Sequence, residues 1–416
     1  MRCLVGIDDT DSSRGLCTTY LAYRIACDLR RALEVVPYPR LVRLNPNIPF
    51  KTRGNAAVCL VVETKDPRTA FRLLSSKLAQ LSDVRGGANS ALVFLEDGRS
   101  VPRFRELYRD ALCRVVSPAR VRKMLDSAKV AYTTLGNGMG LVGASASIGF
   151  DEAEDHTFEL ISYRRRESWG ALRDIDAASV KDMDRLTFPR TFNSYDYQKR
   201  KVLICPHGPD PVFAGLRGDS PSSVIDAFGR LRIGEEIEGY MVYVTNQHTD
   251  AHLSLPLDWK TYSSGWTEGL VESVETGPGG HVYATLREGR ISRRCAFYEP
   301  TGDLRRAAKM LVKGDRVRLS GGIRRPTSAH DKILNVEKME MVVPVPVPGR
   351  AFPRGTYIAS PRANRHLTKP LIRYGRGASS PLTEARSWLV GEAIPQRAPS
   401  RSPKSGLQNL LSPLKP

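Results

Sequence analysis

Apolar positions are grouped at the start of the chain in a way that predicts its first two elements. Residues 3–7 form a short apolar run, and Leu21, Ile25, Leu29 and Leu33 follow at every fourth position. A spacing of four residues places these side chains on one face of a helix. The pattern therefore predicts a buried strand, a loop and an amphipathic helix that starts near residue 16.

The pattern changes from residue 269 onward, where strand-like segments dominate. They span residues 269–275, 281–288, 292–299, 315–321 and 333–341. Residues 303–312 lie between the third and fourth of these segments and have helical periodicity. Five strands with a helix between the third and fourth is the order of an OB-fold barrel, a common binder of single-stranded nucleic acid. Another small barrel is the alternative.

These blocks indicate several domains. Residues 1–115 mix strand and helix patterns, and residues 116–190 begin with a helix-like segment. Residues 343–416 hold 12 of the 28 prolines, which predicts an extended linker followed by a basic, largely disordered tail. A chain of 416 residues with 41% hydrophobic content can bury more than one core. We therefore expect a multidomain α/β and α+β protein.

The net charge of +19 narrows the class of partner. The tail, residues 343–416, contributes +10, and the remaining +9 still makes the body basic. Such an excess favours a polyanionic partner, nucleic acid above all. No apolar run is long enough to span a bilayer and no secretory signal is visible, so a cytoplasmic protein without a membrane partner is expected. The seven cysteines contain no C-x-x-C pair, which predicts no zinc site.

Three carboxylates follow the first predicted strand. Asp8, Asp9 and Asp11 would repel one another strongly if they were held close together and away from water. Hard divalent cations such as Mg²⁺ accept this ligand set and usually bring phosphates with them. A loop between a strand and a helix is also a frequent binding place for phosphorylated ligands. The alternative is a solvated turn with a helix N-cap.

Four further segments have candidate chemistry. Residues 43–55 form a loop with Lys51 and Arg53, and residues 204–218 form a second strand-to-helix connection with His207 and Arg217. These cationic side chains suit phosphate groups. Two other segments are less specific. Residues 136–144 are glycine-rich, which allows either close approach of a ligand or tight packing. Residues 244–252 are dense in polar side chains, which indicates an inward polar network or the wall of a site.

Seven segments in one order then identify a family. They are GIDDTDSSRGLCTTY, RLNPNIPFKTRGN, GNGMGLVGA, PHGPDPVFAGLRG, TNQHTDAH, EPT at 299–301 and ASPRANRHLTKPL. Together they resemble the archaeal tRNA-isoleucine 2-agmatinylcytidine synthetases over roughly residues 1–375.

The resemblance implies a domain order. It gives a kinase-like α/β domain over residues 1–115, completed by residues 191–264, a ferredoxin-like α+β domain over 116–190 and an OB-fold β-barrel over 265–342. Residues 343–416 would hold a degenerate zinc ribbon and a basic, Pro-rich tail. The family's two C-x-x-C pairs, expected near residues 343–356, are missing from this chain.

The resemblance also implies an activity. The enzyme would use ATP and Mg²⁺ to join agmatine to C2 of the wobble cytidine in an isoleucine tRNA with a CAU anticodon, through a phosphorylated cytidine. Asp8, Asp9 and Asp11 would hold the metal, Thr18 would match a threonine that the family phosphorylates on itself, and a monomer is expected. The candidate phosphate ligands are Lys51, Arg53, Gly54, Asn55, His207, Gly208, Arg217 and Gly218. The candidate agmatine ligands are Asn137, Gly138, Gly140 and Gly143.

Two other functions are compatible with the residues alone. One is a Mg²⁺-dependent RNA nuclease or phosphatase that uses the same aspartates with water as the nucleophile. The other is a non-catalytic OB-type RNA-binding protein whose acidic loop is only a turn.

Overall fold

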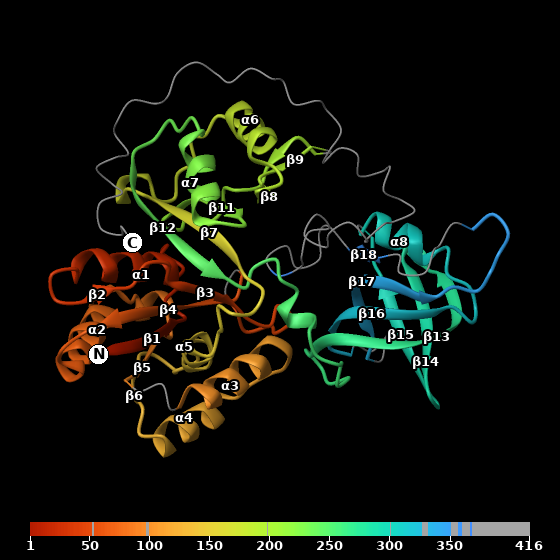
Figure 1. Cartoon of the computed structure of the whole chain (residues 1–416), viewed down its shortest axis with the longest axis horizontal. Helices are drawn as coiled ribbons and strands as arrows, with labels where there is room; N and C mark the ends of the chain where they lie inside the picture. The colour runs from red at the N-terminus through yellow and green to blue at the C-terminus, as the bar shows by residue number, and fades with distance from the viewer. Residues whose placement is uncertain are drawn as a thin grey trace.

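The computed structural model describes residues 1–51, 54–96, 100–197, 199–299, 301–326, 332–350, 357–359 and 367. Within these ranges the chain forms a mixed α/β body and a separate C-terminal sheet beside it (Figure 1). The predicted mixed α/β class is confirmed at this level.

A ten-stranded sheet is the centre of the body. Its strands are β1 (Arg2–Asp8), β2 (Glu34–Val35), β3 (Arg40–Arg43), β4 (Ala56–Glu63), β5 (Ala91–Leu95), β6 (Ala131–Thr134), β7 (Thr157–Arg164), β8 (Thr191–Phe192), β11 (Val212–Gly218) and β12 (Ile237–Thr245). The strand order is β6-β5-β1-β4-β3-β12-β7-β11-β8, and β2 pairs with β4. All neighbours are antiparallel except β3 and β12. A single sheet thus joins strands from residues 1–115, 116–190 and 191–264.

Helices cover both faces of this sheet (Figure 1). They are α1 (Thr18–Asp28), α2 (Pro67–Leu81), α3 (Val101–Cys113), α4 (Pro118–Ser127), α5 (Leu141–Ile148), α6 (Ala177–Thr187) and α7 (Pro221–Gly229). Helices α1 and α2 share a core with the inward side chains of β1, while α3, α4 and α5 share a second core with β5. Helices α6 and α7 form a third core with β7, β11 and β12. Strand β1 is therefore covered on both faces, which explains its unbroken apolar run.

The first predicted helix is confirmed but is shorter than its apolar pattern. Helix α1 ends at Asp28, and Leu29 is its C-cap residue. Leu33 is nevertheless buried in the core of α1 and α2, so it follows the helix as part of a turn that packs inward. Sequence periodicity alone does not distinguish a longer helix from a helix followed by an inward-packed residue, because both bury Leu33 on the same side.

The C-terminal sheet has six strands. They are β13 (Ser264–Thr276), β14 (Val282–Glu288), β15 (Ile291–Phe297), β16 (Arg316–Ile323), β17 (Leu334–Val343) and β18 (Tyr357–Ala359), with α8 (Asp303–Ala308) between β15 and β16. The order is β15-β14-β13-β16-β17-β18, and β15 also pairs with β17. The five predicted strands and their helix are all present. Strands β9 (Tyr195–Asp196) and β10 (Lys201–Val202) form a small separate hairpin.

Candidate functional site

The acidic loop occupies the connection between β1 and α1, as the sequence predicts. Asp8 is the last residue of β1, and Asp9 adopts a left-handed backbone conformation with φ 55°. The carboxylate of Asp11 accepts a hydrogen bond of 3.2 Å from the backbone N–H of Thr18, at the start of α1. The N-cap residue of α1 is Cys17, which makes no side-chain cap hydrogen bond, so Asp11 supports the start of the helix without being its N-cap.

Burial and mutual repulsion shape the electrostatics of this loop. Burial raises the pKa of Asp8 well above its ordinary value, and the charges of Asp9 and Asp11 raise it further. Burial and the charge of Asp11 raise the pKa of Asp9 to about 6. The loop therefore disfavours negative charge at both side chains, and a bound cation would relieve this cost.

The glycine-rich run packs against Asp8. A Cβ added to Gly143 would lie 2.6 Å from Cγ of Asp8, and one added to Gly140 would lie 2.7 Å from the Asp8 carbonyl oxygen. On the strand side, a Cβ on Gly6 would lie 2.7 Å from the carbonyl carbon of Ala144. These positions let α5 lie directly on β1, with its first turn beside the Asp8 carboxylate. Tight packing, one of the two roles expected for this run, therefore accounts for Gly140 and Gly143.

Two cavities share Ala56 in their walls. One has a volume of about 390 Å³ and the other about 80 Å³. Predicted residues in the larger cavity are Asp11, Thr18, Gly54, His207 and Arg217. Predicted residues in the smaller cavity are Asp8, Asp9, Lys51, Asn55 and Gly143. The segments that sequence singled out thus meet in space, but the three aspartates are divided between two compartments.

A buried ion network forms one wall of the larger cavity. Glu159, 2% exposed, lies 3.2 Å from the guanidinium groups of both Arg43 and Arg217. Gln247 accepts two further hydrogen bonds from Arg43, and Asn246 accepts one from the Arg43 backbone. Two arginines paired with one glutamate leave one positive charge at this wall, and Lys201 adds another, while Asp11 and Asp210 balance them elsewhere in the cavity lining. The polar density of residues 244–252 is thus part of an inward network behind this wall.

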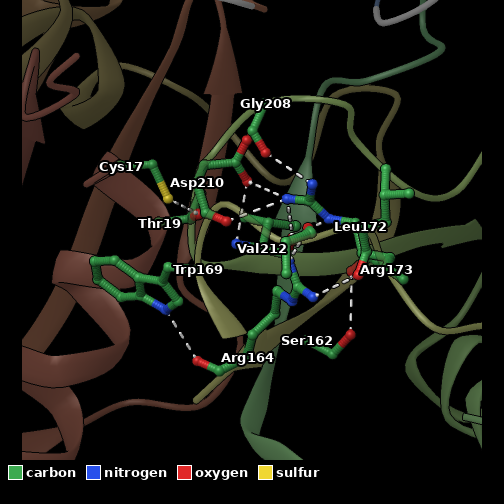
Figure 2. Close-up of polar contacts among 12 residues, drawn as sticks. Cys17, Thr19, Ser162, Arg164, Trp169, Leu172, Arg173, Gly208, Asp210 and Val212 are labelled. Atoms are coloured by element: carbon green, nitrogen blue, oxygen red, sulfur yellow. Dashed lines mark hydrogen bonds and ion pairs between the residues drawn. The ribbon is translucent and has the colours of Figure 1, made fainter. Parts of the chain in front are cut away.

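Two arginines with almost no exposed side chain hold neighbouring loops in place, Arg173 the loop after β10 and Arg164 residues 171–172, and sequence reasoning missed both (Figure 2). The guanidinium of Arg173 donates to the backbone carbonyls of Gly208, Asp210 and Val212 and lies 3.5 Å from the Asp210 carboxylate. Arg164 donates to the carbonyls of Ala171 and Leu172 and pairs with Glu235. The Arg173 guanidinium therefore holds the segment 205–212, part of which lines the larger cavity: Cys205, Pro206, His207, Asp210 and Val212.

The acidic loop touches this same segment. Gly15 has φ 111°, and a Cβ there would lie 2.6 Å from the carbonyl oxygen of Pro209. Nearby, the thiol of Cys17 is buried, which raises its pKa to about 12, and the charges of Asp11 and Asp210 act in the same direction. The role of Arg173 in holding backbone carbonyls could not be predicted, because an arginine in a polar stretch gives no sequence signal for it. Glu159 could have been noticed, because it is a charged residue between apolar neighbours in a strand.

The remaining candidates are placed as follows. The Thr18 hydroxyl accepts a hydrogen bond of 3.2 Å from the Thr10 hydroxyl. Gly218 pairs with β8 and lines neither cavity, and Gly208 supplies a carbonyl to Arg173. Asn137 caps a turn by accepting from the Met139 N–H, beside Gly138 with φ 74°. Arg53 lies outside the described residues.

The donor set fits a nucleotide-bound Mg²⁺ better than a protein-only metal cage. Within the described ranges, no three His, Cys, Asp or Glu side chains converge on a common metal position. Mg²⁺ commonly takes one or two protein carboxylates and completes its shell with phosphate oxygens and water. Asp8 and Asp9, which line one cavity and have raised pKa values, meet that requirement.

The fold and site define a class: an α/β protein with a carboxylate loop at the end of a strand and a neighbouring cavity whose wall contains arginines, which suits phosphorylated ligands. No helix among the described residues is long and apolar enough to cross a membrane. The sequence profile of the TiaS TCKD domain matches residues 4–71, and that of the TiaS FLD domain matches residues 138–252.

Comparison with whole proteins makes the identification specific. The tRNA-isoleucine 2-agmatinylcytidine synthetase TiaS of Cenarchaeum symbiosum is 43% identical over 341 residues, 81% of this chain and 76% of the relative. The crystal structure of TiaS in complex with its isoleucine tRNA and ATP matches with a TM-score of 0.81 at 31% identity, over 91% of this chain and 99% of that one. The complex of TiaS with the same tRNA, AMPCPP and agmatine matches with a TM-score of 0.80 at 31% identity, over the same shares.

The chain belongs to the tRNA-isoleucine 2-agmatinylcytidine synthetase family. The family predicted from the seven sequence segments is confirmed.

Proposed function

We propose that this protein is an ATP-dependent carbon–nitrogen ligase that joins agmatine to C2 of the wobble cytidine of an isoleucine tRNA with a CAU anticodon. One observation supports it above the others: the match extends over nearly the whole length of a relative whose structure contains isoleucine tRNA, AMPCPP and agmatine. The site agrees in chemistry, because it combines carboxylates for a cation with arginine and lysine side chains for phosphates.

The proposed reaction has two steps. The γ-phosphoryl group of ATP moves to the O2 oxygen of the cytidine, which leaves ADP. The primary amine of agmatine then attacks C2 and phosphate departs with that oxygen, while the nitrogen loses a proton. Phosphorylation is required because an unmodified carbonyl oxygen is a poor leaving group.

The residues divide this work between the two cavities. Asp8 and Asp9 are the proposed Mg²⁺ ligands, and Mg²⁺ would neutralise charge between the phosphates when it is bound. Asp11, the third ligand predicted from the sequence, lines the other cavity and could reach the ion only from there. Arg217, with Arg43 behind the same wall, draws phosphate oxygens into the larger cavity. Lys51 serves the smaller one. Arg53, His207, Gly54, Asn55, Gly208 and Gly218 remain proposed phosphate-loop residues.

Several finer assignments belong to the same proposal. Residues 265–342 are proposed as an OB-fold barrel, residues 1–115 with 191–264 as a kinase-like domain, and residues 116–190 as a ferredoxin-like domain. Agmatine contacts at Asn137, Gly138, Gly140 and Gly143 stay a prediction, as do the modification of Thr18, the monomeric state and the absence of zinc. An enzyme that acts on tRNA would work in the cytoplasm.

Labelled agmatine provides the direct test. The protein is incubated with ATP, Mg²⁺, labelled agmatine and a CAU-anticodon tRNA transcript, and label is counted in the RNA. Asp8→Asn should abolish incorporation, because it removes a proposed metal-binding charge. Asp126→Asn, which changes an exposed carboxylate on α4, is the matched control and should keep full activity.

The outcome also separates the alternatives. A nuclease or phosphatase would process the RNA without needing agmatine, and a binding module would show no turnover in either variant. Full incorporation by purified Asp8→Asn would contradict the proposed role of the acidic loop.

A further inference from the structure

The C-terminal sheet has a group of aromatic side chains that the proposed chemistry does not use. The rings of His281 and Tyr298 are 5.2 Å apart, and those of Tyr283 and Tyr298 are 6.4 Å apart, both edge to face. The guanidinium of Arg294 lies 4.8 Å from the centre of the Tyr283 ring. We call His281, Tyr283, Tyr298 and Arg294 the aromatic cluster. The three rings are partly exposed, and Arg294 is exposed.

Strand register explains why this cluster faces outward. Along β14, Val282, Ala284 and Leu286 are buried in the core, so the alternate residue Tyr283 must lie on the other face. Arg294 is paired in register with Thr285, which lies on the same outer face as Tyr283. Three aromatic rings outside a core bury only part of their apolar surface, so the packing of the sheet does not account for them.

The cluster is linked to the site through the end of β16. Strand β15 ends one residue before Tyr298 and β16 ends one residue before Arg324, and both strands pair with Leu334 and Asn335 of β17, on either side of it. The charge of Arg324 accordingly acts on the pKa of both Tyr298 and Lys51. Burial is the largest cause of the lowered pKa of Lys51, and repulsion from Arg324 comes next. Lys51 itself lines the smaller cavity together with Asp8 and Asp9.

Direct contacts hold the sheet against the loop that contains Lys51. The side-chain amide of Asn45 donates to the Tyr262 carbonyl at 2.8 Å, and that of Asn47 donates to the Ser264 hydroxyl at 2.7 Å. The same Asn47 amide packs against the Cα of Gly322 in β16. These contacts place the end of β16, which Arg324 follows, beside the loop that contains Lys51.

The charge of this part of the chain favours RNA as its occupant. Residues 264–326 contain 12 Lys and Arg against 7 Asp and Glu. Glu275 lies 3.8 Å from Arg294 and offsets part of its charge, whereas Glu299 pairs with Arg305. Exposed rings interleaved with arginines are the arrangement by which proteins bind unpaired nucleotides, through base stacking and phosphate contact.

We propose that the aromatic cluster stacks unpaired nucleotides of the anticodon loop next to the reacting cytidine, while Arg294 and Arg324 contact their phosphates. The inference rests on the proposed function for the identity of the RNA. The extruded base enters the compartment of Asp8 and Asp9, and its neighbours in the loop lie along Lys51, Arg324 and the rings of Tyr298 and Tyr283.

Binding of an isolated anticodon stem–loop, without ATP or agmatine, tests this proposal. Tyr283→Ala and Tyr298→Ala should each weaken binding on the order of tenfold, because each removes one stacking surface. Tyr283→Phe and Tyr298→Phe keep the ring and should bind like the unchanged protein. Tyr132→Ala is the matched control, since Tyr132 also has an arginine, Arg122, over its ring but lies on β6 in the body.

Three results would overturn the proposal: unchanged binding in both alanine variants, an equal loss in Tyr132→Ala, or a loss restricted to a minihelix that copies the acceptor arm. Loss of binding in the phenylalanine variants would show that the hydroxyl groups act instead of the rings. If the alanine variants fail to fold by thermal unfolding, Arg294→Gln replaces them and should lower the salt dependence of binding by about one phosphate contact. An unchanged salt slope there would also contradict the proposal. The experiment measures binding and not turnover, so its result can be interpreted even if the protein has no ligase activity.

Discussion

Gly143 should be important for activity, because a side chain at this position would displace the Asp8 carboxylate. A Cβ at this position would lie 2.6 Å from Cγ of Asp8, whereas ordinary contacts begin at 3.4 Å. The carboxylate oxygen Oδ2 of Asp8 lies nearer still, so in Gly143→Ala the carboxylate must retreat by more than about 0.8 Å, or α5 must lift off β1. The second route is opposed by the close contact between Gly6 and Ala144.

The two routes have different costs. Lifting α5 would be an overpacking effect, typically about 1 to 3 kcal/mol in the free energy of unfolding. Displacing a reacting group by about 1 Å commonly lowers a rate by about 100-fold. We expect Gly143→Ala to lose about 100-fold in agmatine incorporation at saturating ATP, agmatine and tRNA.

The assay compares incorporation rate and thermal unfolding in Gly143→Ala and Gly229→Ala. A Cβ on Gly229 meets no atom within 4 Å, and the residue ends α7, so this control should keep its activity and its stability. Normal turnover in Gly143→Ala would refute the reasoning, because it would mean that the position of the Asp8 carboxylate does not matter.

Two further predictions concern the wall of the larger cavity and the tail. Arg173→Met should lower the free energy of unfolding by about 3 kcal/mol, because it leaves Asp210 buried without its cation, and should raise the KM for ATP more than it changes kcat. Arg173→Lys should restore part of the stability, and a methionine variant as stable as the unchanged protein would contradict this prediction. Removing residues 371–416, which contain seven Lys and Arg and two Glu, should weaken tRNA binding and flatten its salt dependence, and an identical salt titration would exclude a role for this tail.

The acidic loop shows how far sequence reasoning reached. An apolar run, a carboxylate cluster and a helical face predicted β1, its loop and α1 correctly, because these depend on near neighbours in the chain. The end of α1 was less predictable, since Leu33 is buried without being helical. The role of Gly143 was open, because a glycine has the same sequence appearance whether a ligand or a carboxylate fills the space beside it.

The order of motifs along the chain determined the family, and the spacing of apolar residues determined most elements of secondary structure. Only the tertiary structure divided the aspartates between two cavities, paired Glu159 with two arginines, and assigned Arg173 to the carbonyls of residues 208–212. The physical reason is that these contacts join residues 35 to 116 positions apart, whose distances are set by strand order and helix packing. A polar side chain in a sequence reveals its charge but not which distant backbone will surround it.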